Sequence, residues 1–150
     1  MSTSSRKETR VISLARADEG ARQTRPLYSS QPAAGFPAPG DDMVEQALDL
    51  NELLIEDPIA TFYVRVAGDS MEGARIFDGD ILVVDRSVEA APGMIVVAAV
   101  YGELVVKMLA RTAQGFVLAS AQEGYDPIPV AEADDCVVWG VVTGTVRRFR

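Results

Sequence analysis

The chain has 150 residues, of which 48% are hydrophobic and 24% charged, as in one globular domain large enough to bury a core. Its formal net charge of −8 is uneven, because residues 1–34 carry six basic and three acidic side chains and residues 35–150 carry eight basic and nineteen acidic ones. An acidic body argues against direct sequence-specific DNA binding, the single Cys136 excludes an internal disulfide, and the longest apolar run, residues 94–101, is far too short to cross a membrane.

Residues 1–34 are predicted to be a flexible N-terminal arm. The first nine residues are rich in Ser, Thr and charge, and residues 24–39 are dense in Pro, Gly, Ser and Ala. A short amphipathic segment at residues 11–15 could pair or dock, but it is too short to form a core and offers no helix-turn-helix. The arm has no secretory signal, and with the lone Cys136, expected to be a small buried apolar residue, this favours a cytoplasmic protein.

The next segment contains a peptide bond that a protease groove would accept. Ala34 and Gly35 leave their shared bond sterically open, and Pro37 and Pro39 keep the following chain extended. An extended segment of this kind can enter a groove as an added strand. A plain flexible linker would have the same composition, so the residues alone leave both interpretations open.

A short helix is expected just after this segment. Asp49 at the N-cap and Glu52 three residues later fit a capping box, and Pro58 ends the helix. Upstream, Met43, Val44, Ala47 and Leu48 have helical spacing and are expected to pack under a sheet as part of a helix.

From residue 61 onward nearly every signal is β. Short runs of β-branched and aromatic residues alternate with glycine-containing turns such as Asp78-Gly79-Asp80 and the tight hairpin Tyr101-Gly102-Glu103. The predicted strands are Thr61–Ala67, Ile81–Asp85, 94–101, 103–110, 116–119 and 137–149. The sequence therefore predicts a mainly β fold, a small coiled antiparallel sheet or barrel with a short helix and an extended N-terminal arm.

Two residues in this region are candidates for chemistry. Ser70 follows a glycine at the end of a strand, and Lys107 lies inside the apolar run Val105-Val106-Lys107-Met108-Leu109. The chain contains no histidine, so a serine nucleophile would need another base, and lysine is a known alternative. An exposed lysine is protonated at neutral pH, but burial disfavours the charged form and makes general-base work possible. Taken singly, a turn serine and a lysine on the wet face of a strand explain the same residues.

These segments occur in an order that resembles the LexA/UmuD family of self-cleaving Ser-Lys peptidases, and most closely its UmuD branch. The resemblance covers about residues 34–150, and Ser70 and Lys107 have the expected separation of 37 residues. The matching motifs are Ala34-Gly35-Phe36-Pro37, Val44-Glu45-Gln46, Leu48-Asp49-Leu50-Asn51, Gly68-Asp69-Ser70-Met71, Asp78-Gly79-Asp80, Val83-Val84-Asp85 and Val105-Val106-Lys107.

The resemblance implies a site and its substrate. Ser70 would be the nucleophile, Lys107 its buried base, and the backbone N–H groups of Asp69 and Ser70 the oxyanion hole. The scissile bond would be Ala34-Gly35 of the same chain or of a partner subunit, so residues 1–34 form the removable arm and residues 35–150 the peptidase and polymerase-accessory domain. The 34-residue arm is long for this branch. No cofactor or metal is implied, and the Asp78-Gly79-Asp80 turn lacks the ligand spacing of a calcium loop.

The resemblance also implies partners. Proteins of this branch form homodimers, meet the RecA–single-stranded DNA filament after DNA damage, lose their arm, and then join a Y-family polymerase subunit (UmuC-like) in error-prone translesion synthesis. Three alternatives remain: a Ser-Lys signal peptidase, which should have a membrane anchor; a non-catalytic dimeric polymerase accessory module; and a LexA-like peptidase or repressor relative without a DNA-binding domain.

Overall fold

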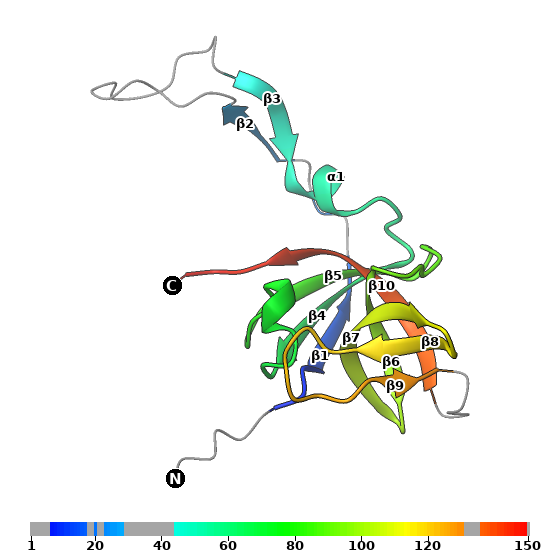
Figure 1. Cartoon of the computed structure of the whole chain (residues 1–150). Coiled ribbons are helices and arrows are strands. Elements are labelled where there is room, and N and C mark those ends of the chain that lie inside the picture. The colour runs from blue at the N-terminus through cyan, green and yellow to red at the C-terminus, as the bar shows by residue number, and fades with distance from the viewer. Residues whose placement is uncertain (1–6, 18–19, 21–22, 29–43, 131–135, 150) are drawn as a thin grey trace.

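The computed structural model describes residues 7–17, 20, 23–28, 44–130 and 136–149. A closed antiparallel barrel makes up most of it (Figure 1), and its strands follow the order β1-β4-β5-β10-β6-β7, with β7 returning to β1. The six strands are β1 (Arg10–Arg16), β4 (Thr61–Ala67), β5 (Ile81–Asp85), β6 (Ile95–Val100), β7 (Glu103–Thr112) and β10 (Cys136–Val146). The mainly β, barrel-like fold expected from the sequence is confirmed.

Two further strands extend the sheet beyond β7. They are β8 (Gly115–Ala119) and the very short β9 (Ile128–Pro129). The β6–β7 turn has Tyr101 at φ 51° and Gly102 at φ 79°, the left-handed conformations that a two-residue hairpin loop requires. The predicted hairpin at this position is therefore present, and it fixes the register that carries Lys107 into the barrel.

The segment before the barrel differs from one expectation. Val44–Asp49 forms strand β3, paired with β2 (Thr24–Tyr28), and is not helical. The helical spacing of the apolar residues was misleading, because pairing with β2 decides the backbone conformation there. Helix α1 (Leu50–Leu54) does begin at Asp49, whose Oδ1 accepts a hydrogen bond from the N–H of Asn51 (2.9 Å). The β2–β3 hairpin projects away from the barrel (Figure 1).

The predicted arm contributes a strand to the barrel. Residues 10–16 form β1, which pairs with β4 from Arg10 opposite Ala67 to Arg16 opposite Phe62. The amphipathic segment at residues 11–15 does pair, as the sequence allowed, and it also closes the barrel, because Arg10 lies opposite Val105 on β7. The division of the chain at residue 34 stays a prediction.

Two apolar clusters pack on opposite faces of the barrel strands, because neighbouring residues such as Val105 and Val106 of β7 belong to different clusters. One is centred on Val64, Leu82 and Val106, and the other on Val96, Leu118 and Cys136. Cys136 is 8% exposed and its burial raises the pKa of the thiol, so it packs as the small apolar residue expected from the sequence. Both clusters include residues of β7, and Lys107 lies on the same face of this strand as Val105 and Leu109 of the second cluster.

Candidate active site

Ser70 lies at a corner that only glycine can start. Gly68 ends β4 with φ +121°, a conformation that side-chain-bearing residues avoid, and its N–H donates to Oδ1 of Asp78 (3.0 Å). Asp69 and Ser70 follow, before a short 3₁₀ helix, Glu72–Ala74. The bond to Asp78 ties the corner to the turn before β5, so Ser70 is presented from a rigid end of the barrel.

Lys107 is buried in β7, as the apolar run predicts. Its side chain is among the largest fully buried ones, with 1% exposure, and it lies opposite Val96 of β6. Its Nζ donates to Oγ of Ser120 (2.7 Å) and stands 5.8 Å from the ring centroid of Tyr125. A charged group in such a place needs polar partners, because an unpaired buried ammonium would be strongly destabilising.

The two predicted residues meet at one carboxylate. Oγ of Ser70 contacts Oε1 of Glu8 (3.5 Å), and the same oxygen forms an ion pair with Nζ of Lys107. Glu8 thus lies between the hydroxyl and the amine. The structure brings the two side chains to one place, 37 residues apart in sequence, and their catalytic roles remain predictions.

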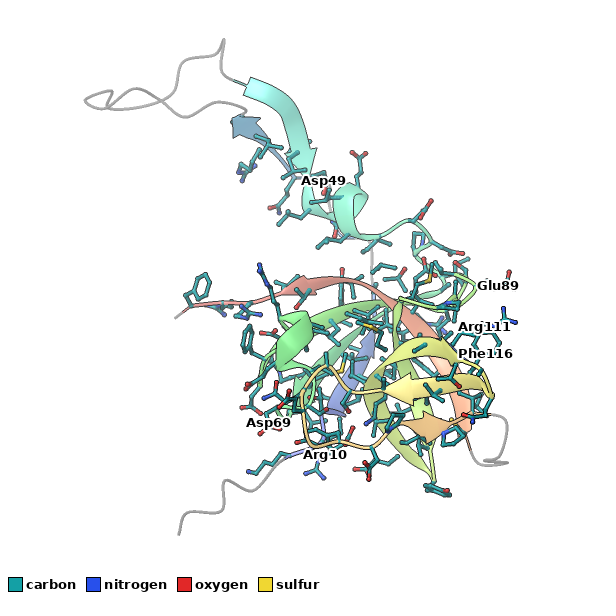
Figure 2. The ribbon with its side chains drawn as sticks, viewed as in Figure 1. Arg10, Asp49, Asp69, Glu89, Arg111 and Phe116 are labelled. Carbon is teal, nitrogen blue, oxygen red and sulfur yellow. The ribbon has the colours of Figure 1, made fainter. Side chains whose placement is uncertain are left out.

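The predicted oxyanion donors lie at the same corner. The N–H of Asp69 donates to the carbonyl of Lys7 (2.7 Å), so this donor faces a peptide oxygen. The carboxylate of Asp69 accepts hydrogen bonds from Tyr125 Oη (2.6 Å) and from the N–H of Lys7 (3.1 Å). Figure 2 shows Asp69 and Arg10 near one another at one end of the barrel. The predicted cleavage site, Ala34 and Gly35, lies outside the described residues.

Three residues of the site were not anticipated from the sequence: Glu8, Ser120 and Tyr125. Ser120 follows β8, whose Ala119 lies opposite Met108, so a correct β7–β8 register would have placed it beside Lys107. Nothing local marks Glu8 or Tyr125, because each reaches the site through the path of a loop or of the N-terminal segment.

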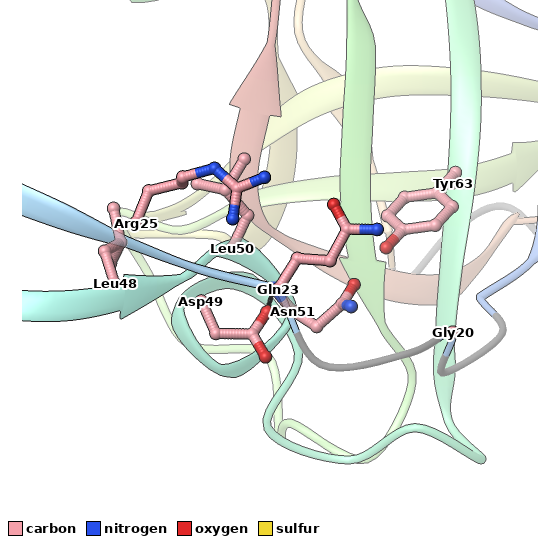
Figure 3. Close-up of a pocket in the computed structure, with 8 residues that line it drawn as sticks. All are labelled: Gly20, Gln23, Arg25, Leu48, Asp49, Leu50, Asn51 and Tyr63. Atoms are coloured by element: carbon pink, nitrogen blue, oxygen red, sulfur yellow. Dashed lines mark hydrogen bonds between the residues drawn. The ribbon is translucent and has the colours of Figure 1, made fainter.

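A pocket away from Ser70 and Lys107 contains none of the candidate catalytic residues (Figure 3). It has a volume of about 660 Å³, opens where the β2–β3 hairpin joins the barrel, and contains no part of the Ser70 corner. Its lining residues are Gly20, Gln23, Arg25, Leu48, Asp49, Leu50, Asn51 and Tyr63. Because none of the candidate catalytic residues lines this pocket, we assign it no chemistry.

Comparison with known proteins decides the family. Residues 26–143 match the family described as Peptidase S24-like. The chain belongs to this family. The resemblance to the LexA/UmuD peptidases is thereby confirmed.

Two of the relatives are of similar size to this chain, and the third is longer. The chain is 40% identical to Protein MucA of Salmonella typhimurium over 79% of this chain and 81% of that protein. It is 35% identical to Protein SamA of the same species over 93% and 97%, and 37% identical to a LexA repressor of Alcanivorax borkumensis over 77% and 55%. In the part of the chain that the structure describes, we find no helix long and apolar enough to span a membrane.

Proposed function

We propose that the chain is a self-cleaving peptidase of the UmuD type that acts in DNA-damage-induced mutagenesis. The observation that carries the proposal is the convergence of Ser70 Oγ and Lys107 Nζ, both on buried side chains, on a single carboxylate oxygen. Membership of the Peptidase S24-like family and the similarity to MucA and SamA support it.

The proposed reaction follows from the groups at the corner. Neutral Lys107 takes the proton of Ser70, and Oγ attacks the carbonyl carbon of Ala34. The N–H groups of Asp69 and Ser70 donate to the resulting oxyanion. Lys107 then returns its proton to the amine of Gly35, which leaves, and water hydrolyses the acyl-enzyme to free the carboxylate of Ala34.

The proposed partners follow from the family. The chain forms a homodimer in the cytoplasm, and a RecA–single-stranded DNA filament favours the pose that brings Ala34-Gly35 to Ser70, which is a population shift and needs no new chemistry. Residues 35–150 then act as a subunit of an error-prone translesion polymerase, beside a UmuC-like Y-family subunit.

The test is the mass of the product. Purified full-length chain is incubated at alkaline pH, and separately with activated RecA filament, and the fragments are weighed. We expect residues 1–34 and 35–150 from the wild type and none from Ser70→Ala. An intact wild type under both conditions would favour the non-catalytic accessory module, and cleavage of Ser70→Ala at the wild-type rate would remove Ser70 from the mechanism.

A further inference from the structure

Residues 7–10, here called the groove segment, lead into β1 and run across the candidate active site, where main-chain hydrogen bonds hold them. The N–H of Asp69 donates to the carbonyl of Lys7 (2.7 Å), and the N–H of Lys7 donates back to Oδ1 of Asp69 (3.1 Å). On the opposite wall, the N–H of Val106 donates to the carbonyl of Thr9 (2.9 Å). Main-chain bonds to both walls are how a peptidase groove holds an extended peptide.

The groove segment also engages both catalytic candidates. Glu8 forms an ion pair with Lys107, and Oγ of Ser70 accepts a hydrogen bond from the N–H of Thr9 (2.8 Å). Under this cover Ser70 and Thr9 are both completely buried. A second peptide has no access to the hydroxyl while the segment is in place, and the amine is engaged by a carboxylate.

The backbone contact is close enough to depend on glycine. A Cβ atom at Gly68 would lie 2.6 Å from the carbonyl carbon of Glu8 and 2.7 Å from Cα of Thr9. Such distances are far inside van der Waals contact, so only a residue without a side chain lets the segment lie on the corner.

The segment is bound out of register for cleavage. The carbonyl at the Asp69 donor belongs to Lys7, whereas the amide at Ser70 Oγ is that of Thr9, in the next peptide unit. A substrate must place one peptide at both points, with its oxygen at the donors and its carbon at the nucleophile. Accepting an N–H bond also places Oγ near the plane of that peptide, whereas attack comes from above the carbonyl.

We propose that the groove segment is a built-in inhibitor of the Ser70–Lys107 site, with the Glu8–Lys107 ion pair as its principal hold. The inference rests on the proposed peptidase function. The segment must withdraw before Ala34-Gly35 can enter the groove, so its release controls self-cleavage. The hydroxyl of Thr9 is buried without a hydrogen-bond partner among the described residues. Its burial has an energetic cost, which weakens the binding of the segment in the groove.

The test compares self-cleavage rates of full-length variants at one alkaline pH. Glu8→Ala removes the ion pair, and we expect cleavage to become about tenfold faster, which corresponds to about 1.4 kcal/mol. Thr9→Val removes the unsatisfied hydroxyl and keeps the N–H bond to Ser70, so it should slow cleavage about threefold. The matched control is Glu89→Gln, which removes one negative charge at an exposed position on the other side of the barrel (Figure 2) and should cleave at the wild-type rate.

The outcomes separate this inference from the proposed function. If the wild type cleaves and Glu8→Ala cleaves at the same rate or more slowly, the proposal that the groove segment is an inhibitor is wrong. The proposed peptidase function is then unaffected. If no variant cleaves, the peptidase proposal fails. Amide hydrogen exchange of Thr9 and Asp69 in the intact chain then tests whether the groove segment occupies the groove. Slow exchange at both amides would support an occupied groove, and exchange as fast as in an unstructured peptide would overturn it.

Discussion

Among single residues, Lys107 has the least usual surroundings in the barrel. Its ammonium is buried, and its polar contacts are Glu8, Ser120 and the face of Tyr125. Ser120 and Tyr125 follow β8, whereas Glu8 belongs to the groove segment that precedes β1. Withdrawal of Glu8 would leave the amine with the Ser120 hydroxyl and with space toward Ser70, the arrangement that proton transfer requires.

Lys107→Ala should abolish self-cleavage at moderately alkaline pH, because it removes the proposed base, whose amine meets Ser70 at the Glu8 carboxylate. Ser70→Ala should do the same, and both variants should keep the barrel. Fragment masses measure cleavage, and circular dichroism checks the fold. Partial recovery of Lys107→Ala at still higher pH would fit deprotonation of serine by solvent base, whereas full activity at moderate pH would remove Lys107 from the mechanism.

Asp80 and Arg147 form a second charged pair, which is structural. Asp80 is 1% exposed and accepts two hydrogen bonds from Arg147, at 2.6 and 2.7 Å, and one from the N–H of Phe77 (2.9 Å). The hydrogen bonds from Arg147 are the main cause that holds the pKa of Asp80 below its usual value. The guanidinium of Arg147 thereby ties the end of β10 to the segment before β5.

Arg147→Ala should destabilise the fold and lower its melting temperature, since it leaves the buried carboxylate of Asp80 without its strongest donors. Because the folded-state pKa of Asp80 is lowered, its contribution is complete above the unfolded value near 3.8 and is lost as pH falls through the folded value. The melting temperature of the wild type should therefore fall below about pH 4, and that of Asp80→Asn should fall less. Asp126→Asn, at an exposed carboxylate, is the control and should follow the wild type.

At the level of elements, β10 closes the barrel by bending. Its first part pairs with β6 and its second part with β5, and the register shifts between Val138 and Gly140 and again between Val142 and Gly144. Glycines at such irregularities allow a strand to turn a barrel corner. Gly140 is the more constrained, because a Cβ there would lie 2.7 Å from Cγ1 of the buried Val84.

Gly140→Ala should therefore destabilise the barrel by about 1–3 kcal/mol through overpacking against Val84. At roughly 2–4 °C per kcal/mol for a chain of this size, the change is measurable as a lower melting temperature. Val137→Ala, at a 61% exposed position of the same strand, is the matched control and should change the melting temperature little. Equal melting temperatures for Gly140→Ala and the wild type would mean that β10 can shift to accept the methyl group.

For the molecule as a whole, the path of the N-terminal segment matters most. β1 belongs to the barrel, yet it lies before the predicted cleavage bond, so cutting Ala34-Gly35 makes β1 a separate peptide. The groove segment is continuous with β1, so release of one is linked to release of the other. In this arrangement self-cleavage would uncover the β4 edge as well as the groove, and an uncovered edge is a surface to which another chain can add a strand.

The isolated 35–150 product should be less stable than intact Ser70→Ala protein, because it lacks the β1–β4 and β1–β7 pairings. Hydrogen exchange should become faster at alternate amides of β4, those of Tyr63 and Arg65, because the Val66 N–H faces Asp80 on the other side. The readouts are melting temperature and residue-resolved exchange. Unchanged protection of Tyr63 and Arg65 would mean that another chain or segment replaces β1.

The β strands from residue 61 onward were predictable from the sequence, because their pattern is local. Runs of β-branched residues bounded by Gly and Asp turns specify strands, and Tyr101-Gly102 specifies its hairpin by the φ angles it permits. The apolar run around Lys107 likewise favoured burial of its amine, and this amine is buried in the structure. These features depend on neighbours a few residues away, so the amino-acid order alone determined them.

Other features were decided only by the tertiary structure. Val44–Asp49 is a strand because β2 pairs with it, and Arg147 is bound because the pairing of β10 with β5 places Asp80 beside it. Glu8 reaches Lys107 because β1 closes the barrel beside β7. Each is a contact between segments far apart in the chain, and nothing in the local composition encodes such a partner. The sequence by itself thus determined that the chain has a serine and a lysine suited to this chemistry. Closure of the barrel determined that the Glu8 carboxylate lies between Ser70 and Lys107.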